Sequence, residues 1–162
     1  MTSQKLEGYM AGSLKNFNLL FFKLHNNPLA HQCTLCDFLI FNKERNVFAI
    51  EAKQITCVNG KGSFARGRLT QESYLELFND FGDNLISLVC LLYYNKTIKS
   101  SYIYLIPIDT LIQTFVFLNK KSINLIDAKV LLSQYEVFYS KKCLDFSILE
   151  QNWFKLYSFS YN

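Results

Sequence analysis

Apolar residues near the start of the chain recur at the spacing of an α-helix. In GYMAGSLKNFNLLFFKLH, residues 8–25, they fall at Met10, Leu14, Phe17 and Phe21. Residues three or four positions apart share one face of a helix. The pattern therefore predicts a first helix with one buried face, which the following Asn-Asn-Pro ends.

The spacing then changes to that of β-strands. CDFLIF (36–41) and NVFAIEAK (46–53) are short, apolar and rich in strand-forming residues, and the polar NKER between them predicts a hairpin. LISLVCLLYY (85–94) is almost continuously apolar, which is typical of a central strand buried on both faces. SYIYLIPI (101–108) is expected to form the strand beside it.

Three further helices are predicted, over residues 71–81, 109–118 and 145–157. Thr70 and Asp109 are expected to cap the first two of these helices, and Gly82 is expected to end the first. The order of elements is then helix, two strands, helix, two strands and helices. This order predicts an α/β domain whose mixed β-sheet is flanked by helices.

Composition limits the classes of protein that the chain can form. With 162 residues and 50% hydrophobic content it can build one core but hardly a second, so residues 1–162 are expected to form a single domain. The formal charge of +4 is compatible with a polyanionic partner but does not require one. No apolar run is long enough to span a bilayer, and the N-terminus lacks the pattern of a signal peptide, so we expect a soluble protein of the cytoplasm.

Cysteine and histidine give weak chemical signals. The five cysteines are odd in number and scattered, which favours a reducing compartment and small buried thiols. Cys33 and Cys36 form a CxxC that a zinc or redox site could use, but no second CxxC or histidine pair accompanies it. His25 and His31 leave a cysteine or serine nucleophile as a minor alternative. The aromatic residues, Trp153 included, fit a core better than a base-stacking surface.

The strand at residues 46–54 carries two charges inside an apolar run. Glu51 and Lys53 share one face of it, because side chains alternate along a strand. Asp37 opens the strand expected to pair with it, so the two carboxylates should converge beside the lysine. Neighbouring carboxylates repel unless a cation intervenes, and their hard oxygens suit Mg²⁺ or Mn²⁺. The alternative is an ion pair of Glu51 with Lys53 or Lys43 on an edge strand.

A basic segment with three glycines follows that strand. Residues 54–68, QITCVNGKGSFARGR, are predicted to form a flexible loop in which Lys61, Arg66 and Arg68 contact DNA phosphates. A solvated loop without a ligand is an alternative of similar weight, and the residue order is not that of a P-loop. The basic FLNKKSI around Asn119 could extend such a phosphate track or form a solvated turn.

An ordered set of residues resembles the PD-(D/E)XK nuclease superfamily, with Cys36 in place of the proline of that motif. The set consists of Asp37, Glu51, Ala52, Lys53 and Gln71. From about Leu24 to Ile126 the chain is most similar to the RecU-type Holliday junction resolvases. It shares with them the order of an aspartate, a hairpin, EAK, a basic loop, a helix starting near a glutamine, and a strand ending at a proline before a helix.

The resemblance implies a restriction-endonuclease-like core and a metal-dependent endodeoxyribonuclease that hydrolyses phosphodiesters. It implies that Asp37 and Glu51 bind Mg²⁺ or Mn²⁺ together with the carbonyl of Ala52. Lys53 would serve the attacking water, and Gln71 would position water or phosphate. It also implies a homodimer that cuts four-way DNA junctions in recombination and repair, because two symmetric cuts require two active sites.

The chain departs from the RecU pattern in two places, and other functions share its residues. SQKLEGYMAG replaces the N-terminal Asn-Arg-Gly signature, and the segment before Asp37 is too short for the stalk that RecU proteins insert into a junction. A virus-type nuclease acting on flaps, ends or single strands has the same layout, and a catalytically silent DNA-binding protein could keep the fold. The sequence leaves open whether Glu7 joins the metal site, and whether the first helix or the segment around Trp153 forms the dimer surface.

Overall fold

The computed structural model describes residues 3–24, 35–140 and 143–151. The strands are β1 (Leu20–Lys23), β2 (Phe38–Phe41), β3 (Val47–Cys57), β4 (Ser63–Ala65), β5 (Leu85–Asn95), β6 (Ser100–Pro107), β7 (Ser122–Asn124), β8 (Tyr139–Ser140) and β9 (Cys143–Leu144). The helices are α1 (Ser3–Leu14), α2 (Glu72–Asp80), α3 (Ile108–Leu118) and α4 (Leu125–Leu131), with 3₁₀ turns η1 (Arg66–Arg68), η2 (Ser133–Tyr135) and η3 (Ser147–Glu150). None of the helices in these ranges is long and apolar enough to cross a membrane.

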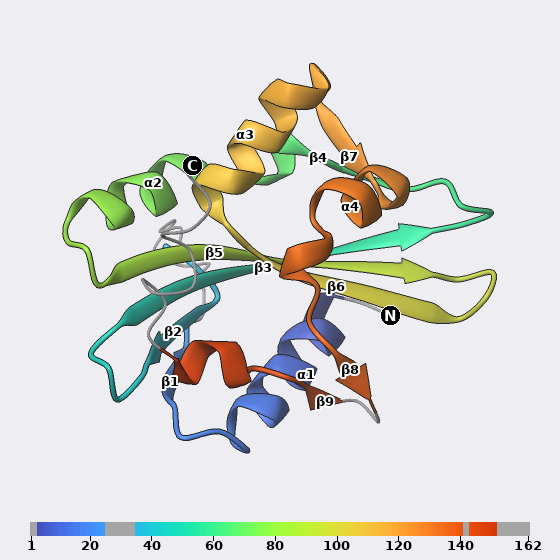
Figure 1. The fold of residues 1–162 in the computed structure, drawn as a ribbon. Coiled ribbons are helices and arrows are strands. Elements are labelled where there is room, and N and C mark those ends of the chain that lie inside the picture. Colours follow the sequence, from blue (N-terminus) through green and yellow to red (C-terminus); the bar gives the residue numbers. More distant parts are fainter. Residues whose placement is uncertain (1–2, 25–34, 141–142, 152–162) are drawn as a thin grey trace, which may run out of the picture.

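Five strands form one mixed sheet in the order β1-β2-β3-β5-β6. β3 and β5 run parallel, and every other neighbouring pair in this sheet is antiparallel. α1 lies on one face of the sheet, and α2, α3 and α4 lie on the other (Figure 1). The expected fold class, an α/β fold with a mixed sheet flanked by helices, is therefore confirmed, as are the hairpin of β2 with β3 and the adjacent strands β5 and β6.

Each face of the sheet carries its own hydrophobic core. The core under α1 includes Leu6, Met10, Leu14, Phe48, Ile50, Leu88, Cys90 and Leu105. The core under α2, α3 and α4 includes Ala49, Ile55, Leu75, Val89, Leu91, Tyr93, Ile106, Leu111 and Ala128. β5 contributes to both cores, which explains why its sequence is apolar at almost every position rather than at alternate ones.

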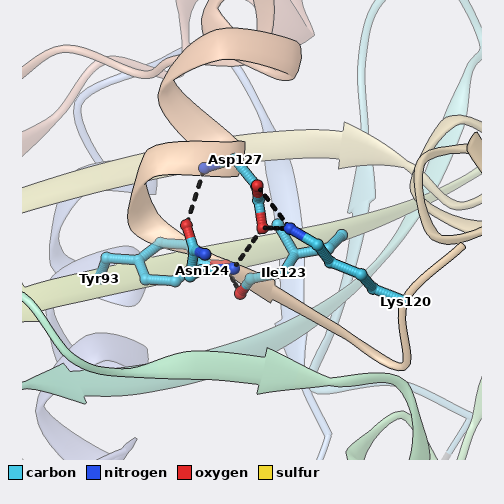
Figure 2. A network of polar contacts seen from close by, with 5 residues as sticks. All are labelled: Tyr93, Lys120, Ile123, Asn124 and Asp127. Atoms are coloured by element: carbon cyan, nitrogen blue, oxygen red, sulfur yellow. Dashed lines mark hydrogen bonds and ion pairs between the residues drawn. The ribbon is translucent and has the colours of Figure 1, made fainter. Parts of the chain in front are cut away.

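A polar network fixes the segment after α3 to the central strand. The Tyr93 hydroxyl of β5 donates to the backbone carbonyl of Ile123 over 2.8 Å. Asn124 caps α4 by accepting from the Asp127 backbone N–H, and the Asp127 carboxylate accepts in return from the Asn124 N–H (Figure 2). The same carboxylate pairs with Lys120 at 3.2 Å. These contacts hold the basic segment after α3 in one place against the sheet.

The helix predicted over residues 8–25 is wrong in its second half. α1 ends at Leu14, and after a turn the chain forms β1, which pairs antiparallel with β2 at the edge of the sheet. The sequence of β1, LFFK, suits a pleated strand as well as a helix. Hydrogen bonding to β2, which no local pattern reveals, decides in favour of the strand.

The C-terminal helix predicted over residues 145–157 is also not observed in its described part. Residues 147–150 form the 3₁₀ turn η3, and the chain is extended at Gln151. Residues 152–157 lie outside the described residues. The buried side chain of Leu149 packs into the core under α1, so this turn closes that core rather than adding a helix to it.

Two expected helix caps and the expected loop need correction as well. α2 and α3 have Gln71 and Pro107 at their N-cap positions, without a side-chain cap, in place of Thr70 and Asp109. The segment 54–68 is not one flexible loop, because β3 continues to Cys57, β4 pairs with β7, and η1 follows. The pairing of β4 with β7, about sixty residues away, provides hydrogen bonds for backbone groups that a solvated loop would have left to water.

Candidate functional site

β3 places an ion pair on the sheet face that α2, α3 and α4 cover. Lys53 Nζ lies 2.6 Å from Glu51 Oε1. The Glu51 side chain is only 3% exposed and that of Lys53 is 18% exposed. The neighbouring positions on this face of β3, Ala49 and Ile55, belong to the hydrophobic core. The pair is therefore a charged interruption in an otherwise apolar face, as the alternation of β3 predicts.

Asp37 joins this pair from the start of the hairpin. The register of β2 with β3 begins at Phe38, which lies opposite Ile50, and Asp37 directly precedes this pair. The Asp37 N–H donates to the Ile50 carbonyl over 3.0 Å, and its carboxylate oxygen Oδ2 accepts from the Ala52 N–H over 2.7 Å. The carboxylate thus replaces a backbone partner where the ladder ends, and it lies close enough to Glu51 for its charge to raise the pKa of that residue.

Burial shifts the titration of both carboxylates. Loss of hydration raises the pKa of Glu51 to about 7, and the nearby charge of Asp37 adds to this increase while Lys53 opposes it. Burial also raises the pKa of Asp37, against the effect of its hydrogen bond from Ala52. At neutral pH Glu51 is therefore partly protonated, and binding of a cation beside it would favour its ionised form.

Two further charges come from elements that the sequence did not connect with the site. The Glu7 carboxylate of α1 raises the pKa of both Asp37 and Glu51, and Lys23 of β1 lowers the pKa of Asp37. Lys23 Nζ pairs with Glu7 Oε2 at 2.9 Å. Glu7 was an open question in the sequence, whereas Lys23 was missed because it fell in the segment predicted to be helical.

The oxygens of the site fit a hard divalent cation. Glu51 Oε2 is buried without a hydrogen-bond partner among the described residues, so it has a free acceptor position. The carbonyl of Ala52 points to the same side of β3 as its N–H, toward Asp37, because both groups of one strand residue face the same way. No group of three or more His, Cys, Asp or Glu residues forms a metal site in the described ranges. A cation bound by two carboxylates and one carbonyl would keep several water ligands, as Mg²⁺ commonly does.

Gln71 is placed near the start of α2, and among the described residues it has no hydrogen bond to the carboxylates. Its side-chain oxygen accepts from the Thr70 hydroxyl over 2.9 Å. Its backbone carbonyl accepts from Leu75 in the first turn of the helix. Within the part of the chain that the structure describes, the amide is therefore held at the helix start rather than joined to Glu51 and Lys53.

The three basic residues of the segment after β3 have different surroundings. Lys61 is exposed in the turn that Val58 closes. Arg66 is paired with the Glu72 carboxylate, to which its Nε donates over 3.0 Å. Arg68 is exposed and donates to the Gln54 carbonyl over 3.2 Å, directly beside Lys53 in the chain. Two of the three basic side chains are thus already fixed by contacts within the protein.

A concavity of about 880 Å³ brings the two basic segments of the sequence together. It lies between α2 and the end of α3, and Arg66, Thr70, Lys120 and Lys121 are among its lining residues. The Arg66 N–H donates to the Lys121 carbonyl over 3.0 Å, which joins the segments directly. Asp37, Glu51 and Lys53 do not line it. Glu72 and Glu76 also line the concavity, which is therefore a separate feature of mixed charge on the α2 and α3 side of the molecule.

The structure argues against a reactive or metal-binding role for Cys36. Cys36 is a buried thiol that donates to the Phe38 carbonyl over 3.1 Å, and burial raises its pKa to about 12. A thiol of this kind is a poor nucleophile and a poor metal ligand. Cys33, His25, His31 and Trp153 lie outside the described residues.

Comparisons with known proteins find similarity to solved structures. The scan against protein-family models and the search of curated proteins find no match. Among solved structures, the chain is similar to that of Archaeoglobus fulgidus Hjc, a Holliday junction resolvase from an archaeal hyperthermophile. Sequence identity is 15%, the TM-score is 0.49, and the match covers 80% of this chain and 93% of that chain. A similarity at this level carries no assignment of activity or substrate.

Proposed function

We propose that the protein is a metal-dependent endodeoxyribonuclease that cuts branched DNA and prefers four-way junctions. The observation that carries the proposal is the buried Glu51, which pairs with Lys53, lies near Asp37, and has one carboxylate oxygen without a hydrogen-bond partner among the described residues. Two close carboxylates with an unused acceptor are a costly arrangement for stability alone. The ordered residues that resemble the PD-(D/E)XK superfamily supply the reaction class.

Each side chain of the site has a role that its position allows. Asp37 and Glu51, with the carbonyl of Ala52, would hold Mg²⁺ or Mn²⁺. When bound, this cation supplies positive charge that polarises the scissile phosphate and lowers the pKa of water. Lys53 would donate a hydrogen bond to the attacking water or to the phosphate as negative charge develops on it. Gln71, at the start of α2, would position water or phosphate at the rim of the site.

Resolution of a four-way junction would require two such sites. Two symmetric cuts need two active sites at a fixed separation, so we propose a C₂ homodimer. The segment before Asp37 is too short for a stalk. Preference for a junction would therefore depend on dimer geometry and on the exposed basic residues Lys61 and Arg68. The preference over duplex DNA is therefore expected to be modest, and the nicks are expected to be paired and symmetric.

The proposal is tested by presenting the purified protein with four DNA substrates. We expect cleavage of a four-way junction in the presence of Mg²⁺ or Mn²⁺, and none when the metal is removed with a chelator. A 5′ flap, a linear duplex and a single strand of the same sequences serve as comparison substrates, and product mapping shows whether the nicks are symmetric. Sedimentation at micromolar concentration reports the oligomeric state.

Each pattern of results leads to a different conclusion. Equal cleavage of the junction and the flap by a monomer would replace the resolvase with the flap, end or single-strand nuclease. Junction binding without cleavage in any metal would replace it with the silent DNA-binding protein. Cleavage that persists after chelation would contradict the metal site itself.

A second prediction concerns the exposed basic residues after β3, Lys61 and Arg68. Replacing Lys61 and Arg68 by glutamine should weaken DNA binding and lower the slope of log K against log salt by about two, about one for each phosphate that is no longer neutralised. Arg66→Gln should change the slope less, because Glu72 already neutralises that guanidinium. Lys43→Gln, at the exposed hairpin turn, is the matched control. An unchanged slope in the double variant would mean that Lys61 and Arg68 contact no DNA phosphates and lie in a solvated segment.

A further inference from the structure

The β1 edge of the sheet carries an uncovered apolar surface. Leu20 and Phe22 are 60% and 52% exposed, and Phe22 packs edge-on against Phe41 with ring centroids 6.0 Å apart. Leu20 is paired with Phe41, and Phe22 with Leu39, whose side chain contacts the core under α2. These side chains therefore share the sheet face on which α2 lies. We call Leu20, Phe22 and Phe41 the edge patch.

The described part of the chain ends beside this patch. Asn42 directly follows Phe41, and its Nδ2 donates to the carbonyl of Leu149 over 2.8 Å and to that of Gln151 over 3.3 Å. These bonds hold the last described residue at the end of β2, one strand away from β1. Whatever follows Gln151 starts within reach of the edge patch.

The eleven residues that follow have the composition of a segment that packs against apolar surface. Residues 152–162, NWFKLYSFSYN, carry a single charged side chain, that of Lys155. Their apolar and aromatic members are Trp153, Phe154, Leu156, Tyr157, Phe159 and Tyr161. Exposure of such a segment to water is unfavourable, and burial against other aromatic rings is favourable.

The segment is also long enough to reach the patch. Eleven extended residues span up to about 36 Å. Crossing two strands takes about 10 Å, and passing from one face of the sheet to the other takes about the same distance. Because the start of the segment is fixed by Asn42, its effective concentration at the patch is on the order of millimolar, well above that of a second molecule in dilute solution.

We propose that residues 152–162 pack across β1 onto the edge patch of the same molecule. The segment would cover Leu20 and Phe22 and shield the outer edge of β1, which pairs with no other strand in the described ranges. The proposal rests on this surface alone and does not depend on the proposed function. Two other arrangements compete with it: the same patch covered by a second copy of the chain, and the segment placed on the exposed Tyr74, Leu77 and Phe81 of α2 and its C-terminal end.

Trp153 is the only tryptophan in the chain, so its fluorescence reports on this segment alone. We expect the full-length protein to emit at the shorter wavelength of a tryptophan shielded from water, with slow quenching by acrylamide. Phe22→Asp should shift the emission to longer wavelength and speed the quenching severalfold. Ile126→Asp, which places the same charge at a 70% exposed position on α4, is the matched control and should change neither.

The alternatives give different results. Emission typical of a fully hydrated tryptophan in the unchanged protein would overturn the proposal. A shift that appears on dilution to nanomolar concentration would assign the patch to a second copy, and a shift in Leu77→Asp but not in Phe22→Asp would move the segment to α2. Either result replaces the proposed arrangement.

A second measurement covers the case in which Phe22→Asp does not fold. Hydrogen exchange is compared between the unchanged full-length protein and the double variant Tyr157→Asp/Phe159→Asp, whose changes lie outside the described fold. We expect faster exchange at the β1 amides of residues 20–23 in the double variant, with unchanged exchange in β5. Unchanged exchange at β1 would overturn the proposal.

Discussion

Replacing Glu51 by glutamine is expected to reduce metal-dependent cleavage of a four-way junction by about a hundredfold or more. The substitution keeps the shape of the side chain and a hydrogen-bond acceptor for Lys53 but removes the charge that a metal requires. Lys53→Ala should reduce cleavage by a similar factor, because it removes a donor to the developing negative charge. Single-turnover cleavage with saturating enzyme measures both effects, and a binding assay should show that DNA affinity persists.

Glu44→Gln is the matched control for this experiment. Glu44 lies in the exposed turn of the same β2–β3 hairpin, and its replacement should leave cleavage unchanged. Lys53→Ala leaves the buried Glu51 without its cation, so its fold needs confirmation by circular dichroism before its rate is interpreted. Undiminished cleavage in Glu51→Gln would remove this residue from the mechanism.

The same Glu51→Gln substitution is expected to raise the free energy of unfolding at pH 8 by about 3 kcal/mol. The pKa of Glu51 is about 7 in the folded protein against 4.5 in an ordinary environment, and each unit corresponds to about 1.4 kcal/mol. Ionised Glu51 therefore destabilises the fold at pH 8, and glutamine removes that cost. Urea unfolding of the two proteins measures the difference.

The pH dependence of this difference tests its electrostatic origin. Between pH 4.5 and pH 7 the folded protein binds a proton at Glu51 that the unfolded chain does not, so lowering the pH stabilises the unchanged protein through this group. The advantage of Glu51→Gln should thus be largest above pH 7 and nearly absent at pH 4. Glu44→Gln should show no such trend. A variant that is less stable than the unchanged protein at pH 8 would contradict the unfavourable burial of Glu51.

Together, the two predictions describe Glu51 as a residue that supports function and lowers the stability of the fold. Substitutions that relieve a strained or charged site commonly increase stability and remove activity. Reduced cleavage with increased stability would exclude unfolding as the cause of the reduction. The stability result stands by itself if no cleavage is found, because it depends only on the burial of Glu51 and on its neighbours.

Local sequence patterns were sufficient for part of the site. The alternation along β3 placed Glu51 and Lys53 on one face, and the hairpin turn NKER brought Asp37 beside β3, where it accepts from the Ala52 N–H. These relations involve residues within about fifteen positions, so the strand period and a short turn determine them. Gln71 is different: its place at the start of α2 follows from the sequence, whereas its distance from the carboxylates depends on how α2 packs.

The short strands that differ from expectation share one physical cause. β1 was predicted as helix, and β4 and β7 were not predicted at all, because each is short and is stabilised by a strand far away in the chain. The pairing of β1 brought Lys23 beside Glu7, and the pairing of β4 with β7 brought Arg66 beside Lys121. Backbone hydrogen bonds between distant segments outweigh weak local preferences in such short elements.

Local patterns alone were enough to establish the element types of most long segments, the hairpin, and the face that Glu51 and Lys53 share. Packing between distant elements was needed to establish that β3 lies parallel to β5, that two cores cover both faces of these strands, and that the pair is consequently almost dry. Hydration of a carboxylate depends on every group that surrounds it, not only on its neighbours in the chain. For this reason the sequence could name Glu51, but its burial and its pKa of about 7 follow from the packing of elements that are distant in the chain.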